Sequence, residues 1–490
     1  MDNLRFYGNN ISDYLTKRSL CILNSDAFDK FIKALDEETG YGRCFDLSKR
    51  PLTVGGRRAY FYFATSLSND LILSRIITAL IEYEKETDSF DTIIKEAIVC
   101  ADATLKSDVK EIARAVLSGM SALTVDGIEG AVVMETRSLP TRGIEEPESD
   151  HVLKGSHDGF SESLIKNIGL IRRRIRSQRL NVEKLCVGKE SKSDIALCYL
   201  DGKCDEDFLS KLRADIESIR VDALALSQES LAECLVPKRW FNFFPKFRYT
   251  ERPDAAAAMI LEGSVIVICD NSPQVMILPC AILDFVGESN DFYFPPVIGT
   301  YLRAVRITVF LLTLFMTPIW YLLLRNPEYI PSFFSFAFPD SLKGPPVLFQ
   351  LLLVEFTIDA LKLASLNTPS SLGSSLSVVA GLIIGDFAVQ TGWLSGEVIL
   401  YMSFVAMANF TQPSYELGYA FKFSRVLLLI LIAIADLWGF IIGLSLILML
   451  IVFGRRINSK YSYLYPILPF DKRALKRQLL RVKLMCGKKK

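Results

Sequence analysis

The feature that most constrains this chain is a change of character near its middle. Residues 1–255 are rich in charged side chains, whereas residues 296–454 consist mainly of long apolar runs. The run at 307–324, ITVFLLTLFMTPIWYLLL, is uncharged and long enough to cross a bilayer, which takes about 20 residues. We therefore expect a multi-domain protein, with two tandem α+β cytosolic subdomains followed by an α-helical transmembrane bundle.

Overall charge and the rare residue types exclude several classes of function. Lys and Arg total 56 and Asp and Glu total 55, a balance that argues against a protein that coats nucleic acid. The chain has two histidines, and its ten cysteines form no CxxC pair, so we expect neither a metal site nor a disulfide scaffold. P-loop, GxGxxG and GxSxG motifs are absent from the sequence. We predict no enzyme activity, no cofactor and no nucleic-acid partner.

The charge-rich half contains a weak internal repeat. Residues 113–138 align without gaps on residues 257–282. In both copies a helix end leads through glycine into an alternating strand, and a turn at 126–127 or 270–271 leads into a second strand. The pattern predicts two related α+β subdomains, with chance similarity as the alternative.

Composition and pattern divide the chain into six segments. The predicted segments are 1–44, a polar N-terminal segment; 45–138, the first subdomain; 139–182, a charged loop and an arginine-rich helix; 183–295, the second subdomain; 296–454, the transmembrane domain; and 455–490, a basic tail.

The segment 161–180, SESLIKNIGLIRRRIRSQRL, predicts an amphipathic helix with one apolar stripe and arginines on its flanks. The stripe residues are Leu164, Ile168, Ile171 and Ile175. An acidic loop precedes this helix, and opposite charges on the two elements favour ion pairing between neighbouring copies in a ring. A solvated helix face and a lipid-binding surface are the alternatives. The predicted contact residues are Glu145, Glu146, Glu148, Arg172, Arg173, Arg174 and Arg176.

Acidic side chains also lie inside the apolar half. On a helix over 347–366, Glu355, Asp359 and Lys362 share one face. Because a carboxylate in a bilayer is costly unless it faces water or a cation, we predict an ion path lined by segments 347–366 and 375–392. An ion pair of Asp359 with Lys362, or a helix lying in the membrane interface, is the alternative. The predicted path residues are Glu355, Asp359 and Asp386, and the predicted helix-packing residues are Gly381 and Gly385 of a GxxxG motif.

The remaining apolar segments and the tail predict the topology. Segment 398–410 predicts a further span, and 426–454 is longer than one span needs, so it predicts a helical hairpin or one tilted helix. Residues 455–490 carry twelve basic residues and one acid, which places the tail in the cytoplasm and next to anionic lipid. With the N-terminus also inside, we expect four or six spans.

Two stretches carry a resemblance to a known family. IEEPE at 144–148 with GSHDGF and LIRRRIR after it, and VEFTIDALKLASLNTPSSLGSSLSVVAGLIIGDFAVQTG at 354–392, resemble the GerA-type spore germination receptor A subunits. The resemblance covers about residues 50–480, and KGSHDGF stands where the family usually has RGPRDGF.

The resemblance implies a multi-pass protein of the spore inner membrane that assembles with itself as a ring, of five copies by analogy, and acts with other germination proteins. It also implies an ion channel that releases cations and amplifies the germination signal. A non-conducting membrane scaffold for germination proteins is the alternative.

Overall fold

The computed structural model shows a chain that divides into two compact units. The N-terminal unit comprises Met1–Val152, Ser156–Pro237 and Tyr249–Pro279, and the C-terminal unit comprises Leu153–Gly155, Lys238–Arg248 and Cys280–Lys490. The structure describes residues 26–85, 89–98, 102–138, 155–236, 242–287, 290–330, 332–338, 344–367, 381, 385, 387–412, 414–452 and 462–480.

The first sheet of the N-terminal unit is antiparallel throughout, in the order β1-β2-β4-β5-β3. Its strands are β1 (Leu47–Val54), β2 (Arg57–Ala64), β3 (Ala103–Lys106), β4 (Ser121–Val125) and β5 (Ala131–Met134). β1 and β2 form a hairpin whose turn is Gly55-Gly56, at φ of 55° and 76°, a backbone conformation that glycine adopts at little cost. Along β2, Phe61 and Tyr62 enter cores on opposite faces of the sheet, as the two-residue period requires.

The second sheet repeats this topology, with the order β6-β7-β9-β10-β8. Its strands are β6 (Leu180–Val187), β7 (Ser193–Leu200), β8 (Arg248–Thr250), β9 (Val265–Cys269) and β10 (Val275–Leu278). The strands that follow the predicted turns pair as hairpins, with positive φ at Gly127 and Asn271. The matching strand order confirms the internal repeat.

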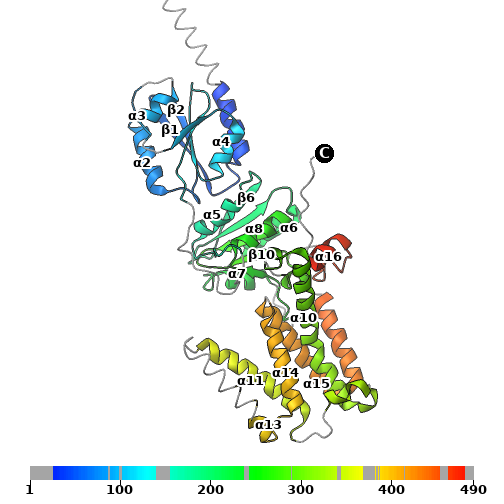
Figure 1. Cartoon of the computed structure of the whole chain (residues 1–490). Coiled ribbons are helices and arrows are strands. Elements are labelled where there is room, and N and C mark those ends of the chain that lie inside the picture. Colours follow the sequence, from blue (N-terminus) through cyan, green and yellow to red (C-terminus); the bar gives the residue numbers. More distant parts are fainter. Residues whose placement is uncertain are drawn as a thin grey trace, which may run out of the picture. The chain divides into compact units, whose positions relative to one another are not determined.

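Helices cover both faces of the first sheet (Figure 1). The helices of the N-terminal unit include α2 (Asp70–Ile81), α3 (Phe90–Glu96), α4 (Val109–Val116), α5 (Leu164–Arg174), α6 (Glu206–Ser218), α7 (Gln228–Leu235) and α8 (Pro253–Glu262). A helix over 26–39 packs with α4 against one face through Phe28, Ile32 and Leu35, while α2 and α3 cover the other. Residues 26–44 thus form part of this subdomain, ahead of the predicted boundary at 45.

The arginine-rich helix α5 is the first helix of the second repeat, because it precedes β6 as the helix over 26–39 precedes β1. All four residues of its predicted apolar stripe are buried. The helix ends at Arg174, and Ile175 is extended, because the chain must turn into β6. Arg176 therefore lies outside the helix, which corrects the predicted helix end near residue 180.

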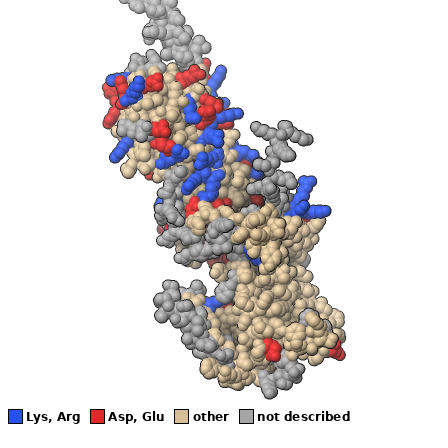
Figure 2. Space-filling model, viewed as in Figure 1, with Lys and Arg blue, Asp and Glu red and all other residues tan. Residues whose placement is uncertain are grey.

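Where the structure describes it, the C-terminal unit is almost entirely helical. Its helices are α9 (Asn290–Tyr293), α10 (Pro296–Arg325), α11 (Val347–Asn367), α13 (Ala388–Gln390), α14 (Gly396–Phe410), α15 (Tyr415–Val452) and α16 (Lys472–Leu479), with short 3-10 turns η1 (Ile282–Phe285), η2 (Pro327–Tyr329) and η3 (Ser332–Ala337). On the face drawn in Figure 2, charged side chains gather over the N-terminal unit, whereas most of the surface of the long helices is uncharged.

Helix α15 is a hairpin of two helical arms. The backbone leaves helical geometry at Ala435 and at Asp436, whose φ is 44°. A Cβ added to Gly443 would lie 2.8 Å from Leu428 Cδ2, and one added to Gly439 would clash with the Leu431 carbonyl, so the second arm packs back on the first. Of the two predicted alternatives, the hairpin is therefore the one observed.

Two described helices, α10 and α15, are long and apolar enough to cross a membrane. Most of the predicted segment 375–392 lies outside the described residues. Four or six spans therefore remain a prediction.

Candidate functional site

The predicted acidic helix α11 is fixed at its N-terminal end. Pro345 and Pro346 precede it, as suits residues that cannot donate within a helix. The fully buried Gln350 donates from Nε2 to the Pro345 carbonyl and accepts from the Ser395 amide, both at 2.8 Å. Since Ser395 directly precedes α14, the bond from its amide holds the starts of the two helices together.

One turn further along α11, Glu355 forms a buried ion pair with Arg425 of α15. The Arg425 guanidinium is fully buried, and its Nη1 also donates to the Thr313 carbonyl of α10 at 2.8 Å. A single arginine thus links α10, α11 and α15.

The contacts continue one turn away. Asp359 forms an ion pair with Lys422, and the Lys362 ammonium lies 5.7 Å from the centre of the Tyr419 ring. On both helices the contacting residues are three or four positions apart, so each set occupies one helix face. We call the two ion pairs, Glu355–Arg425 and Asp359–Lys422, the charge ladder.

Burial makes the charge ladder energetically important. In surroundings of low dielectric constant an isolated carboxylate is strongly disfavoured, and removing one partner of a buried pair costs about 3–5 kcal/mol. Both Glu355 and Arg425 are largely removed from solvent, whereas 29% of the Asp359 side chain is exposed. Asp359 is therefore the more exposed acid of the charge ladder.

The other residues predicted to line the path or to pack the helices are Asp386, Gly381 and Gly385. Asp386 lies outside the described residues. A Cβ added to Gly381 or Gly385 would meet none of the described residues within 4 Å, so close helix packing at these glycines stays a prediction. The glycines that do pack closely are Gly439 and Gly443, a second GxxxG motif that our sequence reading overlooked.

A second group of buried charges lies at the start of α10. Asp291 is fully buried and accepts from Arg303 Nε at 2.9 Å and from Arg306 Nη1 at 3.1 Å. Arg303 also donates to the Gln478 carbonyl of α16 at 3.1 Å, while Gln478 donates to Asp284 at 2.6 Å. These bonds hold α16 beside the first turns of α10.

In the N-terminal unit, Arg172 of α5 is fully buried and bound to Asp46, at 2.9 Å from Nε and 2.7 Å from Nη2. Burial by itself lowers the pKa of Arg172, but the charge of Asp46 outweighs burial and raises that pKa above its ordinary value. Since Asp46 directly precedes β1, the pair joins the two repeats. This burial corrects the expectation that Arg172 contacts another copy.

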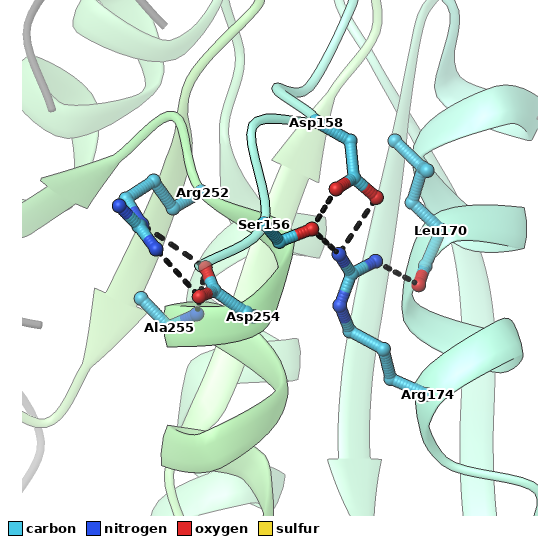
Figure 3. Close-up of polar contacts among 7 residues, drawn as sticks. All are labelled: Ser156, Asp158, Leu170, Arg174, Arg252, Asp254 and Ala255. Carbon is cyan, nitrogen blue, oxygen red and sulfur yellow. Dashed lines mark hydrogen bonds and ion pairs between the residues drawn. The ribbon is translucent and has the colours of Figure 1, made fainter. Parts of the chain in front are cut away.

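Arg174 is also engaged within the chain. It donates to Asp158 at 2.7 Å, to Ser156 at 2.9 Å and to the Leu170 carbonyl at 3.1 Å (Figure 3). The side chain therefore holds the GSHDGF loop against the end of α5, which is an intramolecular role in place of the predicted contact with another copy.

Figure 3 also shows the pair formed by Arg252, at the start of α8, with Asp254. Its two bonds measure 3.0 Å from Nε and 2.6 Å from Nη2, and Arg252 is almost wholly buried. The pair fixes the first turn of α8, since Asp254 also accepts from the Ala255 amide.

The remaining predicted ring-contact residues fall into two groups. Arg173 and Arg176 are exposed, as a contact surface requires. The acidic partners Glu145, Glu146 and Glu148 lie outside the described residues. The ring contact thus stays a prediction, now resting on two arginines.

Within the described part of the chain, no cluster of His, Cys, Asp and Glu is arranged to hold a metal ion. The polar groups that the structure does gather at the charge ladder are carboxylates paired with cations. Such an arrangement can hold, release or exchange cations, but it offers no nucleophile positioned by a base.

Sequence reasoning missed the cations of the charge ladder. Arg425 and Lys422 stand immediately before the apolar run at 426, a position that we read as the membrane boundary. Their three-residue spacing was the available signal, because it places both on one helix face, as Glu355 and Asp359 are.

Comparisons with known proteins give a consistent result. The profile of the family described as Bacillus/Clostridium GerA spore germination protein matches residues 33–490. The chain is 34% identical over 445 residues to stage V sporulation protein AF of Bacillus subtilis (strain 168), covering 90% of each chain. It is 28% identical over 471 residues to spore germination protein KA of the same organism, covering 94% of this chain and 85% of the relative.

Among solved structures, the N-terminal domain of the A subunit of the Bacillus megaterium spore germinant receptor GerK3 is similar. It is 21% identical, with a TM-score of 0.39, and the match covers 50% of this chain and 92% of that chain.

Proposed function

Because the chain belongs to the Bacillus/Clostridium GerA spore germination protein family, we propose that it is a membrane-embedded component of spore germination that conducts cations. The family match and the relatives' names support the role in germination. The conduction proposal rests on one observation, the charge ladder between α11 and α15.

The charge ladder supports conduction because ionised groups inside an apolar bundle are expensive and commonly mark an ion path. Lys422 and Arg425 lie against Asp359 and Glu355 and balance their negative charges without a bound ion. In the proposed open state, α11 moves away from α15. The same carboxylates then replace part of the hydration shell of a cation.

A buried hydrogen-bond donor also supports a watery path. Arg425 Nε has no hydrogen-bond partner among the described residues, although the side chain is fully buried. Buried polar groups without a protein partner are commonly satisfied by ordered water. Water beside Arg425 would also hydrate its partner, the Glu355 carboxylate.

We further propose that the path is completed by a ring of copies in the spore inner membrane, with both chain ends on the cytoplasmic side. The ring contact would use the exposed Arg173 and Arg176, with Glu145, Glu146 and Glu148 of the next copy as partners. Other inner-membrane germination proteins would associate with this ring.

The test is potassium efflux from germinating spores that carry single-charge variants. We expect D359N to lower the efflux rate without lowering protein abundance, because Asp359 is the more accessible acid. E328Q is the matched control, since it removes one exposed acid from the same unit.

The test of the buried Glu355 requires a double variant. E355Q alone strands the Arg425 charge and destabilises the bundle, so E355Q should be combined with R425M, which removes both charges. Efflux at the wild-type rate in both D359N and E355Q/R425M would remove the carboxylate-lined path.

A non-conducting scaffold is the second candidate, and one observation favours it. Each acid of the charge ladder already has its own cation in a single chain, as a purely structural clamp would. A scaffold would carry no current after purification, yet would still co-purify with other germination proteins, and both points can be measured on one sample.

A further inference from the structure

The segment 462–480, which contains α16, is tied to the base of α10. The Tyr463 hydroxyl donates to the Pro245 carbonyl at 2.7 Å, and the Tyr463 carbonyl accepts from the Ile282 amide at 3.1 Å. At its other end, Gln478 bonds to Arg303 and Asp284. Both ends of this segment are therefore fixed within the C-terminal unit, and we call it the basal segment.

These bonds set the depth of the basal segment relative to the apolar run of α10. Gln478 contacts Arg303, which precedes Ile307, the first residue of the apolar run, by four residues, about 6 Å along a helix. The headgroup layer of a bilayer lies just outside its hydrocarbon core. The basal segment therefore lies at headgroup level if α10 spans the membrane from Ile307 onward.

The surface of the basal segment is unusual for a part facing only water. Phe470 is 70% exposed, Leu468 48% and Ile467 43%, three large apolar side chains within four residues. On α10, Val297 and Tyr301 are exposed as well, one helical turn apart. Exposed apolar and aromatic side chains of this kind are typical of a membrane interface.

Basic side chains accompany these apolar ones. Lys472, Arg473 and Lys476 are exposed on α16, and none of them forms an ion pair with a described residue. The acid that precedes them, Asp471, accepts from the Arg473 and Ala474 amides and so serves as the helix cap. Among the described residues, the positive charge of α16 thus has no acidic ion-pair partner.

We propose that the basal segment is a binding surface for anionic phospholipid headgroups, with Lys472, Arg473 and Lys476 as the headgroup contacts and Ile467, Leu468 and Phe470 inserted into the interface. The positive charge of this surface complements an anionic leaflet. The inference rests on the membrane insertion in the proposed function but needs no conduction. Fixed at both ends, the basal segment would hold α10 at a constant depth.

The first test counts lipids bound to the purified full chain in detergent, by native mass spectrometry, with phosphatidylglycerol or phosphatidylcholine added at equal concentration. We expect preferential retention of phosphatidylglycerol, reduced by up to about fivefold for each basic residue removed in K472Q/R473Q/K476Q. K110Q/K166Q/K211Q is the matched control, because it removes three exposed lysines from the N-terminal unit. Equal retention of both lipids by the wild type, or no change in the α16 variant, overturns the proposal.

The second test measures insertion directly. In vesicles containing brominated phosphatidylglycerol, the added fluorescence of F470W should be quenched, whereas that of L226W, at a site 70% exposed in the N-terminal unit, should not. Equal quenching of the two variants contradicts insertion of the basal segment.

Failure of this inference is distinguishable from failure of the proposed function. Lipid preference and F470W quenching without any ionic current would retain the lipid surface and remove the channel. Ionic current without lipid preference would retain the channel and remove the lipid surface.

Discussion

The buried pair between Arg172 and Asp46 gives the sharpest prediction about stability. In D46N the guanidinium remains fully buried, but its carboxylate partner becomes a neutral amide. Removing one partner of a buried ion pair costs about 3–5 kcal/mol, because the remaining charge keeps its desolvation penalty. Since the pair joins α5 to the start of β1, we expect the loss to appear in both repeats.

The chain offers a matched control of the same chemistry. Arg58 binds Asp126 at 3.1 Å and 2.9 Å, but 49% of the Arg58 side chain is exposed. Exposed pairs contribute about 0–1 kcal/mol, so D126N should have a small effect. The predicted difference between the two variants therefore comes mainly from burial, since Arg58 also lies 3.5 Å from an Asp29 carboxylate oxygen.

The assay is amide hydrogen exchange of the intact chain, followed by mass spectrometry of peptides that cover α5 and β1. Because 1.4 kcal/mol corresponds to a factor of ten, D46N should speed exchange in these peptides by at least about a hundredfold where opening breaks the pair. D46N/R172M should recover most of the protection, since no charge is then stranded. Equal protection in D46N and D126N would refute the reasoning.

Three further predictions follow from single contacts. G443L should destabilise the α15 hairpin by about 1–3 kcal/mol, because its side chain meets the first arm, whereas G381L meets none of the described residues. Thermal unfolding in detergent compares the two variants, and equal losses would contradict the hairpin. R173E combined with R176E should dissociate the ring with its fold intact, and a full-size complex on size exclusion would count against that contact. Burial raises the pKa of Cys204 to about 11, so its thiolate forms only at high pH. The rate of Cys204 alkylation should therefore keep rising up to about pH 11. A rate that levels off near pH 9 would show an unshifted thiol.

The sequence predicted those parts of the fold that depend on local pattern. The hairpin turns at Asp126-Gly127 and Asp270-Asn271 follow from turn chemistry, and the buried stripe of α5 follows from helical period. The strand order could not be derived in this way, because it depends on pairing between distant segments. The internal repeat nevertheless implied that both sheets would share one order, which they do.

Only the acidic residues of the candidate site could be predicted from the sequence. Glu355 and Asp359 are conspicuous in an apolar segment, but their partners lie about 60–70 residues away, at what looked like a helix boundary. Position in the sequence does not reveal burial, as Arg172 shows. Five arginines lie within 171–179, and the structure buries Arg172 while leaving Arg173 exposed, because α5 packs one face against the sheets.

The most direct test of the central claim is a reversal-potential measurement on the purified full chain in planar bilayers under a potassium chloride gradient. Our account predicts unitary currents that reverse near the potassium equilibrium potential, and a shift toward zero in D359N but not in E328Q. A correctly assembled wild-type sample that passes no current, or passes chloride as readily as potassium, would contradict the account.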